Sequence, residues 1–380
     1  MGVTTGQNRI LMHVLLVEVP GNSAVRMGVE AAIAAAGHVL AVHPAESDVL
    51  LVCGTPGPEL HAVIDRVWDQ MPYPKHRAML TSLEEIGTVF TTSQEALADR
   101  RVQRSSARED AIGHTDGRDS EEDEHPNHEH SGNTDDAGDA DELMQDHNMT
   151  MGGHDHMSMD HMSMSGPGGY PLADGADDRD GLEMDVLHRR LGPILPVWAA
   201  GVVLDVTLAG DTITDASASI VDVDVDDHGR AESQNGAVFA LDQAAQVLTL
   251  AGWGTAAART LRVRDLAVTG RLKQARERIR PLIRRIERSV LLRWSLRGLQ
   301  VRPDVDVRTV LLARLERADA ALNGRYFEPE PVTSVDEIPA LVKGRDIGSA
   351  RLVVAALSVH PSRRTDTTDQ AGTTKRHQHG

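Results

Sequence analysis

The hydrophobic pattern of this chain stops near residue 101 and returns only near residue 181. Between Glu109 and Asp180 there are twenty-one acidic residues and two arginines, a local charge of −19 against −18 for the whole chain. Such a segment has too little apolar surface to offset the entropy lost on ordering. The 380 residues are therefore expected to form two folded domains, residues 1–100 and 181–360, joined by a disordered acidic linker at 101–180 and followed by a disordered tail at 361–380.

The first domain has the pattern of an α/β fold. Short apolar runs bounded by turn residues predict strands, and segments with a 3.6-residue apolar period predict helices. Their alternation favours a doubly wound, mostly parallel sheet, with ligands expected beyond the carboxyl ends of the strands, at loops 20–23 and 54–58. The predicted strands are 12–19, 38–43, 47–54 and 77–82, and the predicted helices are 25–37, ending at Gly37, and 59–71.

The second domain reads as α+β. Two β-rich runs within residues 200–225 flank Ala209-Gly210-Asp211, a hairpin signal. Helices are predicted within 255–299, at 305–322 and near 346–358. From Arg259 to Arg297 there are thirteen basic residues against three acidic ones, and an apolar stripe is expected on the face opposite the arginines, with a new helix or a kink at Pro281. The stripe comprises Leu282, Ile283, Ile286, Val290, Leu291 and Trp294.

One run in the first domain carries a resemblance to a known family. Residues 48–75 combine an apolar strand, a Gly-Thr turn, a helix and the run Trp68-Asp69-Gln70-Met71-Pro72-Tyr73-Pro74-Lys75. This segment resembles the 20-kDa cluster-bearing subunit of NADH–quinone oxidoreductase (respiratory complex I) and the related small subunit of nickel–iron hydrogenases, which carry a Tyr-Asp-Gln-Met-Pro-x-Pro-Lys run. The resemblance extends less closely over residues 12–90 and implies the same α/β fold.

A weaker resemblance begins at Leu191. The stretch LGPILPVWAAGVVLDVTLAGDTI is similar to the amino-terminal hairpin of the 49-kDa complex I subunit, a relative of the hydrogenase large subunit. The matching positions are Gly192, Pro193, Pro196, Gly201, Gly210 and Asp211. Together the two resemblances imply that one chain joins reduced versions of two subunits that pack together in the parent complexes.

The cysteine content departs from both families. The 20-kDa family holds an iron–sulfur cubane through four cysteines, including an adjacent pair after the first strand, where this chain has Pro20-Gly21-Asn22-Ser23. Cys53 is the only cysteine, and it lies inside a strand that we expect to be buried. The resemblance therefore implies a cluster-free, non-catalytic subunit or assembly partner of a complex I-like or hydrogenase-like oxidoreductase, with no catalytic or cofactor-binding residue carried over.

A second function is suggested by residues 144–164, which contain seven methionines and a repeated Asp-His-Met-Ser-Met unit. Thioethers suit Cu(I), and imidazoles suit Cu(II), zinc or nickel. A copper- or nickel-handling protein is thus the alternative to a scaffold. The simplest interpretation is a solvated linker of biased composition that has no metal-binding role. The candidate ligands are His147, Met149, Met151, His154, His156, Met157, Met159, His161, Met162 and Met164.

Other candidate sites and the compartment follow from simpler observations. Loop 54–58 could bind a phosphate at the start of the next helix, but it lacks the lysine of a P-loop. The alternating Asp222, Asp224 and Asp226 favour a solvated edge strand over a calcium site. The arginine helices lack interleaved aromatics, which argues against nucleic acid and for an acidic partner. A single cysteine and no transmembrane segment indicate a cytoplasmic protein, with peripheral association to a membrane complex through a partner left open.

Overall fold

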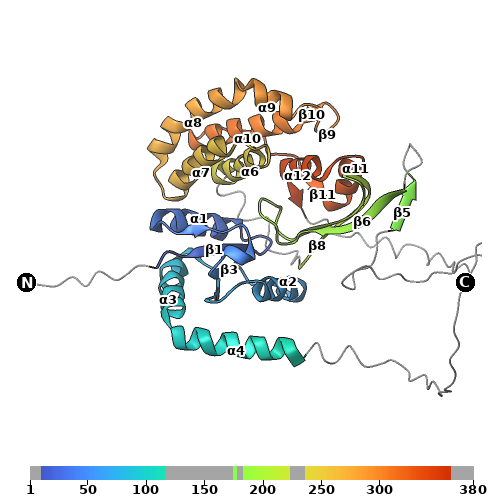
Figure 1. The fold of residues 1–380 in the computed structure, drawn as a ribbon. Coiled ribbons are helices and arrows are strands. Elements are labelled where there is room, and N and C mark those ends of the chain that lie inside the picture. Colours follow the sequence, from blue (N-terminus) through green and yellow to red (C-terminus); the bar gives the residue numbers. More distant parts are fainter. Residues whose placement is uncertain (1–9, 117–173, 178–182, 223–235, 361–380) are drawn as a thin grey trace, which may run out of the picture. The chain divides into compact units, whose positions relative to one another are not determined.

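The computed structural model describes residues 10–116, 174–177, 183–222 and 236–360 (Figure 1). The described residues within 1–104 and 174–380 belong to one compact unit, and residues 105–173 are assigned to a second unit. In the first unit the N-terminal α/β region and the C-terminal region share contacts, most directly between α1 (Ser23–Ala36) and the helices α6 (Gly236–Leu250) and α7 (Gly254–Val268).

The N-terminal region is built on a parallel four-stranded sheet in the order β2-β1-β3-β4. Its strands are β1 (His13–Glu18), β2 (Val39–Leu40), β3 (Val49–Cys53) and β4 (His76–Leu80), with Val14 opposite Val49 and Leu50 opposite Arg77. All of β3 is buried, as its uninterrupted apolar run predicts. The predicted strand at 38–43 is reduced to two exposed residues, because β2 pairs only at the edge of the sheet.

Helices cover both faces of this sheet, so the doubly wound arrangement is confirmed. On one face, side chains of α1 and α3 (Ile86–Ala98) pack with Val14, Leu51 and Cys53. On the other face, α2 (Pro58–Asp69) packs with Leu50 and Val52, joined by Val203 and Val221 from the C-terminal region. The C-terminal region thus completes the core on the second face of the sheet.

The expectation of disorder from residue 101 is wrong for the first part of the acidic linker, because α4 spans Arg100–Asp116. Its first turn is capped by the Asp99 carboxylate, which accepts hydrogen bonds from the amides of Arg101 and Val102 at 3.0 and 3.1 Å. The helix contains few apolar residues, so its capping residue Asp99 is the main local signal for it in the sequence. A short strand, β5 (Asp174–Asp177), also lies within the predicted linker, and residues 117–173 lie outside the described residues.

The C-terminal region opens with an antiparallel sheet in the order β5-β6-β7-β8. Its further strands are β6 (Glu183–Leu191), β7 (Val202–Ala209) and β8 (Thr212–Ile220). Gly210 and Asp211 form the two-residue turn between β7 and β8, as predicted, and Gly210 adopts the positive φ of 62° that such a turn requires. Leu204, Val206 and Leu208 face the main apolar core.

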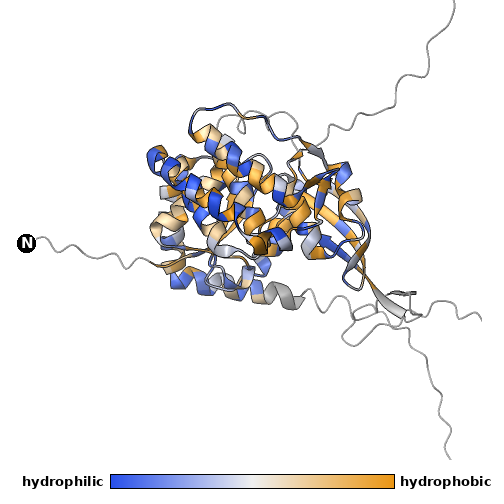
Figure 2. Cartoon of the chain, turned by 90° about the horizontal axis from the view of Figure 1, so that it is seen from above, coloured by the Kyte–Doolittle hydropathy of each residue, from blue (hydrophilic) through white to orange (hydrophobic). Residues whose placement is uncertain are grey.

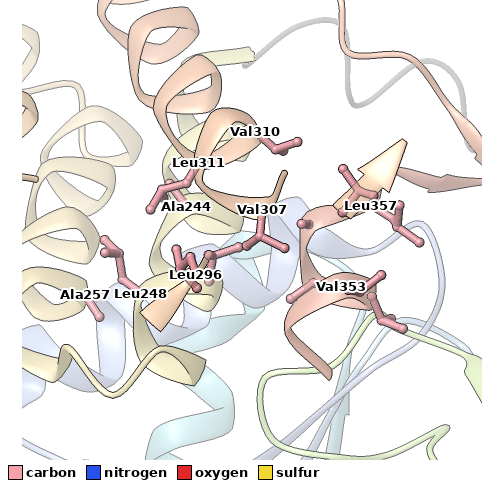
Figure 3. Close-up of a cluster of buried hydrophobic side chains, with 14 of the residues drawn as sticks. Ala244, Leu248, Ala257, Leu296, Val307, Val310, Leu311, Val353 and Leu357 are labelled. Carbon is pink, nitrogen blue, oxygen red and sulfur yellow. The ribbon is translucent and has the colours of Figure 1, made fainter. Parts of the chain in front are cut away.

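A helical bundle packs around α6, which is buried along most of its length (Figure 3). Its other members are α7, α8 (Leu272–Glu287), α9 (Val290–Ser295), α10 (Val307–Leu322), α11 (Ile338–Val342) and α12 (Ile347–Ala356). Two small sheets pair β9 (Gln300–Arg302) with β10 (Val305–Asp306), and β11 (Thr333–Ser334) with β12 (Val359–His360). The bundle helices combine hydrophobic and hydrophilic residues (Figure 2).

The predicted apolar stripe along the arginine helices is only half right. Leu282, Ile283 and Ile286 are buried, but Val290, Leu291 and Trp294 are exposed. Helix α8 ends at Glu287, and a new helix, α9, starts at Val290. The Ser289 hydroxyl caps α9 by accepting a hydrogen bond of 3.2 Å from the amide of Leu292. In this new helix Leu292 is the buried residue. Pro281 lies inside α8 and does not open a new helix.

Candidate functional site

The candidate site is the carboxyl end of the parallel sheet, where the loops after β1 and β3 meet the C-terminal region. Gly54 has a φ of 106°, and a Cβ on it would overlap the side-chain amide of Asn22, so the two loops touch. Gly201, which precedes β7, has a φ of 72°, and a Cβ there would overlap the ring of Pro20. Glycine at these two positions therefore permits close approach of three chain segments.

The amino terminus of α2 is already occupied by a carboxylate from the other half of the chain. Asp222 accepts hydrogen bonds from the amide of Leu60 at 2.6 Å and from that of Glu59 at 3.3 Å. These are the N–H groups that a phosphate at loop 54–58 would use, so Asp222 takes the place of an external anion.

Asp222 also overturns the edge-strand prediction for its own segment. Strand β8 ends at Ile220, and Asp222 follows it with a φ of 51°, in a turn directed at α2. Asp224 and Asp226 lie outside the described residues. The alternation of Val and Asp predicts a strand. The capping role of Asp222 leaves no local signal, because the residue that it bonds, Glu59, lies 163 positions away in the sequence.

Cys53 is fully buried at the end of β3, in the apolar cluster beneath α1 and α3, as the sequence predicts. Burial, reinforced by the charge of Glu18, raises the pKa of its thiol to about 12. The thiol is therefore protonated at neutral pH, whereas a metal-binding cysteine must be a thiolate.

Within the run that carries the family resemblance, residues 68–75, the side chain of Lys75 lies against the rings of Trp68 and Tyr73. The ammonium of Lys75 lies 4.4 Å from the ring centroid of Trp68 and 4.8 Å from that of Tyr73, and it donates a hydrogen bond of 3.0 Å to the Trp68 carbonyl. The backbone of Lys75 is held by the Gln103 side chain, and Met71 is buried in the core under α2. This run thus shapes the turn between α2 and β4.

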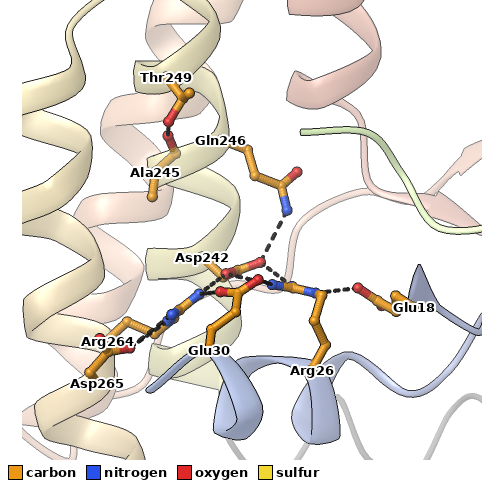
Figure 4. A network of polar contacts seen from close by, with 9 residues as sticks. All are labelled: Glu18, Arg26, Glu30, Asp242, Ala245, Gln246, Thr249, Arg264 and Asp265. Atoms are coloured by element: carbon orange, nitrogen blue, oxygen red, sulfur yellow. Dashed lines mark hydrogen bonds and ion pairs between the residues drawn. The ribbon is translucent and has the colours of Figure 1, made fainter. Parts of the chain in front are cut away.

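A buried ion network joins α1 to α6 and α7 at this end of the sheet (Figure 4). Arg26 of α1 pairs with Glu18 at the end of β1, with Glu30 at 2.6 Å and with Asp242 of α6 at 2.6 Å. Arg264 of α7 reaches the same carboxylates, with Glu30 and Asp242 both at 2.5 Å. The two guanidinium groups therefore share two carboxylates, one from each half of the chain.

Two further partners complete the network. Asp265 accepts from both Nε and Nη2 of Arg264, at 3.0 and 2.8 Å, and Gln246 donates to Asp242 at 3.1 Å. Every dashed contact in Figure 4 that crosses between the two halves ends on Arg26, Glu30, Asp242 or Arg264. Four carboxylates surround two guanidinium groups, which leaves acid in excess.

The pKa values of the network follow from burial and this charge balance. Burial raises the pKa of Glu18 and of Asp265 above their ordinary values, because the neighbouring arginine offsets only part of the cost. Burial would also raise the pKa of Asp242, but Arg26 and Arg264 outweigh it and lower that pKa. The carboxylates likewise raise the pKa of Arg26 and Arg264 against the effect of burial. Asp242 is thus the firmly ionised acid at the centre.

A cavity of about 130 Å³ adjoins the network between loop 20–23 and the C-terminal region. Glu18, Arg26 and Asp242 supply the charged side chains of its lining, and Trp198 and Phe239 are among its apolar residues. Trp198 is fixed by a hydrogen bond of 2.7 Å from its indole N–H to the Val202 carbonyl. The volume is below the roughly 300 Å³ at which small-molecule pockets begin, so this space suits water or a small ion.

The sequence patterns predict no member of this network. Two signals were present: Glu18 interrupts the apolar run VLLVEV, and Asp242 lies within the apolar helix sequence AVFALDQAAQVL. A charged residue inside a buried element needs a partner, but the sequence does not say which.

The Met/His cluster at residues 144–164, from His147 to Met164, lies outside the described residues. Within the described ranges, no group of three or more His, Cys, Asp and Glu side chains is arranged to hold a metal ion. None of the helices in the described part of the chain is long and apolar enough to cross a membrane.

Comparisons with protein-family models, with curated proteins and with solved structures find no match to this chain.

Proposed function

We propose that this chain is a cluster-free, non-catalytic subunit or assembly partner of a complex I-like or nickel–iron hydrogenase-like oxidoreductase. The observation that carries the proposal is the closed carboxyl end of the parallel sheet. In a doubly wound sheet this end is the usual ligand site, and here Asp222 caps α2 while loop 20–23 packs on Gly201.

The single thiol supports the same proposal. Cys53 is buried and protonated, so this chain offers no thiolate for an iron–sulfur cluster at the sheet. A scaffold that retains its core and fills its ligand site acts through its surfaces. The resemblance of residues 48–75 and of the stretch from Leu191 to two neighbouring subunits names the class of complex.

The packing of the two halves agrees with this origin. Arg26 and Glu30 on one side, and Asp242 and Arg264 on the other, form ion pairs whose side chains are largely buried. Buried pairs of this kind are strongly destabilised when one partner is missing, so the halves behave as a single body. The chain would bring both halves to a partner complex at once.

The test is native isolation of the full chain, carrying an affinity tag, from its own cells. We expect subunits of a complex I-like or hydrogenase-like oxidoreductase to co-purify in fixed ratio, and the chain purified alone to hold far fewer than about four irons per molecule. An iron content near four, or a chain that purifies without any such subunit, would overturn the proposal.

A variant lacking residues 144–164 separates this function from metal handling. The scaffold proposal expects the deletion to leave co-purification unchanged. If the deletion abolishes tight binding of Cu(I) or Ni(II) and also abolishes co-purification, then the Met/His segment carries the function and the scaffold proposal fails.

A further inference from the structure

The short helix α9 exposes its large apolar side chains. Val290, Leu291 and Trp294 are 75%, 74% and 72% exposed, although Leu292 and Leu296 of the same segment are buried. The cap at Ser289 fixes this orientation, because it starts a new helix whose inward face is Leu292. Three bulky apolar residues therefore protrude together from one six-residue helix.

Beside this helix lies an open basic groove of about 940 Å³, formed by α7, α8 and the turn before α9. The six arginines that line it are exposed, and among the described residues none of them forms an ion pair. One acidic side chain, Glu277, shares the lining. The six are Arg259, Arg262, Arg278, Arg284, Arg285 and Arg288.

Other arginines of the same segment are used differently. Arg264 is buried against Asp242, and Arg280 donates to the buried carboxylate of Asp319 at 2.5 Å. The fold thus neutralises the arginines it needs for packing and leaves the groove with a large positive excess. Arg288 and Ser289 line the groove, and α9 starts at the next residue, Val290, so the apolar helix begins where the groove ends, and the two together make one candidate surface.

We propose that this surface binds an anionic phospholipid bilayer directly. Trp294, Leu291 and Val290 would enter the boundary between headgroups and acyl chains, while the groove arginines and the exposed Arg293 and Arg297 contact lipid phosphates. Tryptophan favours this boundary because its ring is apolar and its N–H is polar. The inference does not rest on the proposed function.

The chemistry of the surface distinguishes a bilayer from other polyanions. Nucleic acid would be held by the arginines, but it has no use for Val290 and Leu291, and Trp294 alone is a poor stacking platform. An acidic protein would need an apolar pocket shaped to three protruding side chains. A bilayer accepts them without a shaped pocket and supplies phosphates at the same depth.

The test is sedimentation of the full chain with vesicles of neutral phosphatidylcholine alone, and with vesicles in which phosphatidylglycerol replaces part of that lipid. We expect binding only to the anionic vesicles, weakened by high salt because exposed charges are screened. The Trp294 fluorescence should shift to shorter wavelength on binding, and a Trp294→Phe variant should bind while losing that shift.

Two pairs of variants locate the surface. Arg284→Gln/Arg285→Gln/Arg288→Gln should raise the half-binding lipid concentration on the order of a hundredfold. Its control, Arg100→Gln/Arg101→Gln/Arg104→Gln, removes equal charge from exposed positions elsewhere and should leave binding unchanged. Leu291→Ser/Trp294→Ser should weaken binding at least about tenfold, whereas Tyr326→Ser, at an aromatic residue that is 88% exposed, should not.

Circular dichroism and thermal melting establish that each variant is folded. Binding to neutral and anionic vesicles alike, or equal loss in the groove variant and its control, would overturn the proposal. So would capture by heparin or DNA without capture by anionic vesicles, which would assign the groove to a polyanion in solution.

Discussion

The buried Asp242 of α6 and the largely buried Arg26 of α1 form an ion pair of 2.6 Å although they lie 216 positions apart in the sequence. Arg264 shares the same carboxylate at 2.5 Å. This one aspartate therefore pairs with two guanidinium groups from different parts of the chain and links the N-terminal region to the C-terminal region.

Asp242→Ala should lower the free energy of unfolding by about 3–5 kcal/mol, because Arg26 and Arg264 both lose the buried carboxylate that they share and that accepts their hydrogen bonds. Urea unfolding followed by circular dichroism measures the change. Asp215→Ala is the control: its pair with Lys343 spans 3.7 Å with both side chains exposed, so the loss should stay within about 0.5 kcal/mol. Equal losses in the two variants would contradict the role given to the network.

Asp222→Ala should cost about 1–2 kcal/mol, since it removes the cap on the first amides of α2. Asp222→Asn retains one acceptor oxygen and tolerates the positive φ, so it should lose less than half as much. The same urea titration compares them. If alanine and asparagine behave alike, the hydrogen bonds to Glu59 and Leu60 are not what stabilises this junction.

The Glu330→Gln substitution should reduce the loss in free energy of unfolding between pH 7 and pH 3. Burial would raise the pKa of Glu330, but Arg314 and Arg317, which bond its carboxylate at 2.8 Å each, outweigh burial and lower it. A lowered folded pKa stabilises the protein above the unfolded value of 4.5, and that contribution is lost as the pH falls below 4.5.

The variant should therefore be about 2–4 kcal/mol less stable than the parent chain at pH 7, with a smaller difference near pH 3. Glu328→Gln, at an exposed position two residues earlier, is the control and should change stability by less than about 0.5 kcal/mol at pH 7. A deficit of constant size at both pH values would show that charge pairing with Arg314 is not its source.

Cys53 should resist alkylation in the native chain. Its thiol is fully buried with a pKa near 12, so iodoacetamide at pH 8 should react on the order of a thousandfold more slowly than with the urea-unfolded chain. Mass spectrometry of the intact protein over time gives both rates. Rapid labelling of the folded protein would mean that this thiol is open to solvent and available to a metal.

Sequence patterns predicted the elements that depend on local signals. The apolar run at residues 47–54 became β3, Gly37 ends α1 with a positive φ of 75°, and Gly210 turns the β7–β8 hairpin. These features are set by burial on both faces of a strand and by the backbone freedom of glycine, and both are visible in a short window of sequence.

The features that local patterns do not predict share a different cause. Arg26, Asp242 and Asp222 have partners far away in the sequence, which no period or spacing encodes. As one continuous helix, residues 282–294 would put Trp294 on the same apolar stripe as Ile286, whereas Ser289 starts a second helix and Trp294 is exposed. The candidate site is built almost entirely from such distant pairings, so its geometry required the fold.

The shared carboxylate of Asp242 also sets an order of events during synthesis. When α1 leaves the ribosome, Arg26 and Glu30 have each other and Glu18 as neighbours, and more than 200 further residues must follow before α6 delivers its aspartate. Until then Val203 and Val221 are also missing from the second face of the parallel sheet. The N-terminal region therefore keeps apolar surface uncovered until the C-terminal region has been synthesised. During this interval the chain is most prone to aggregation.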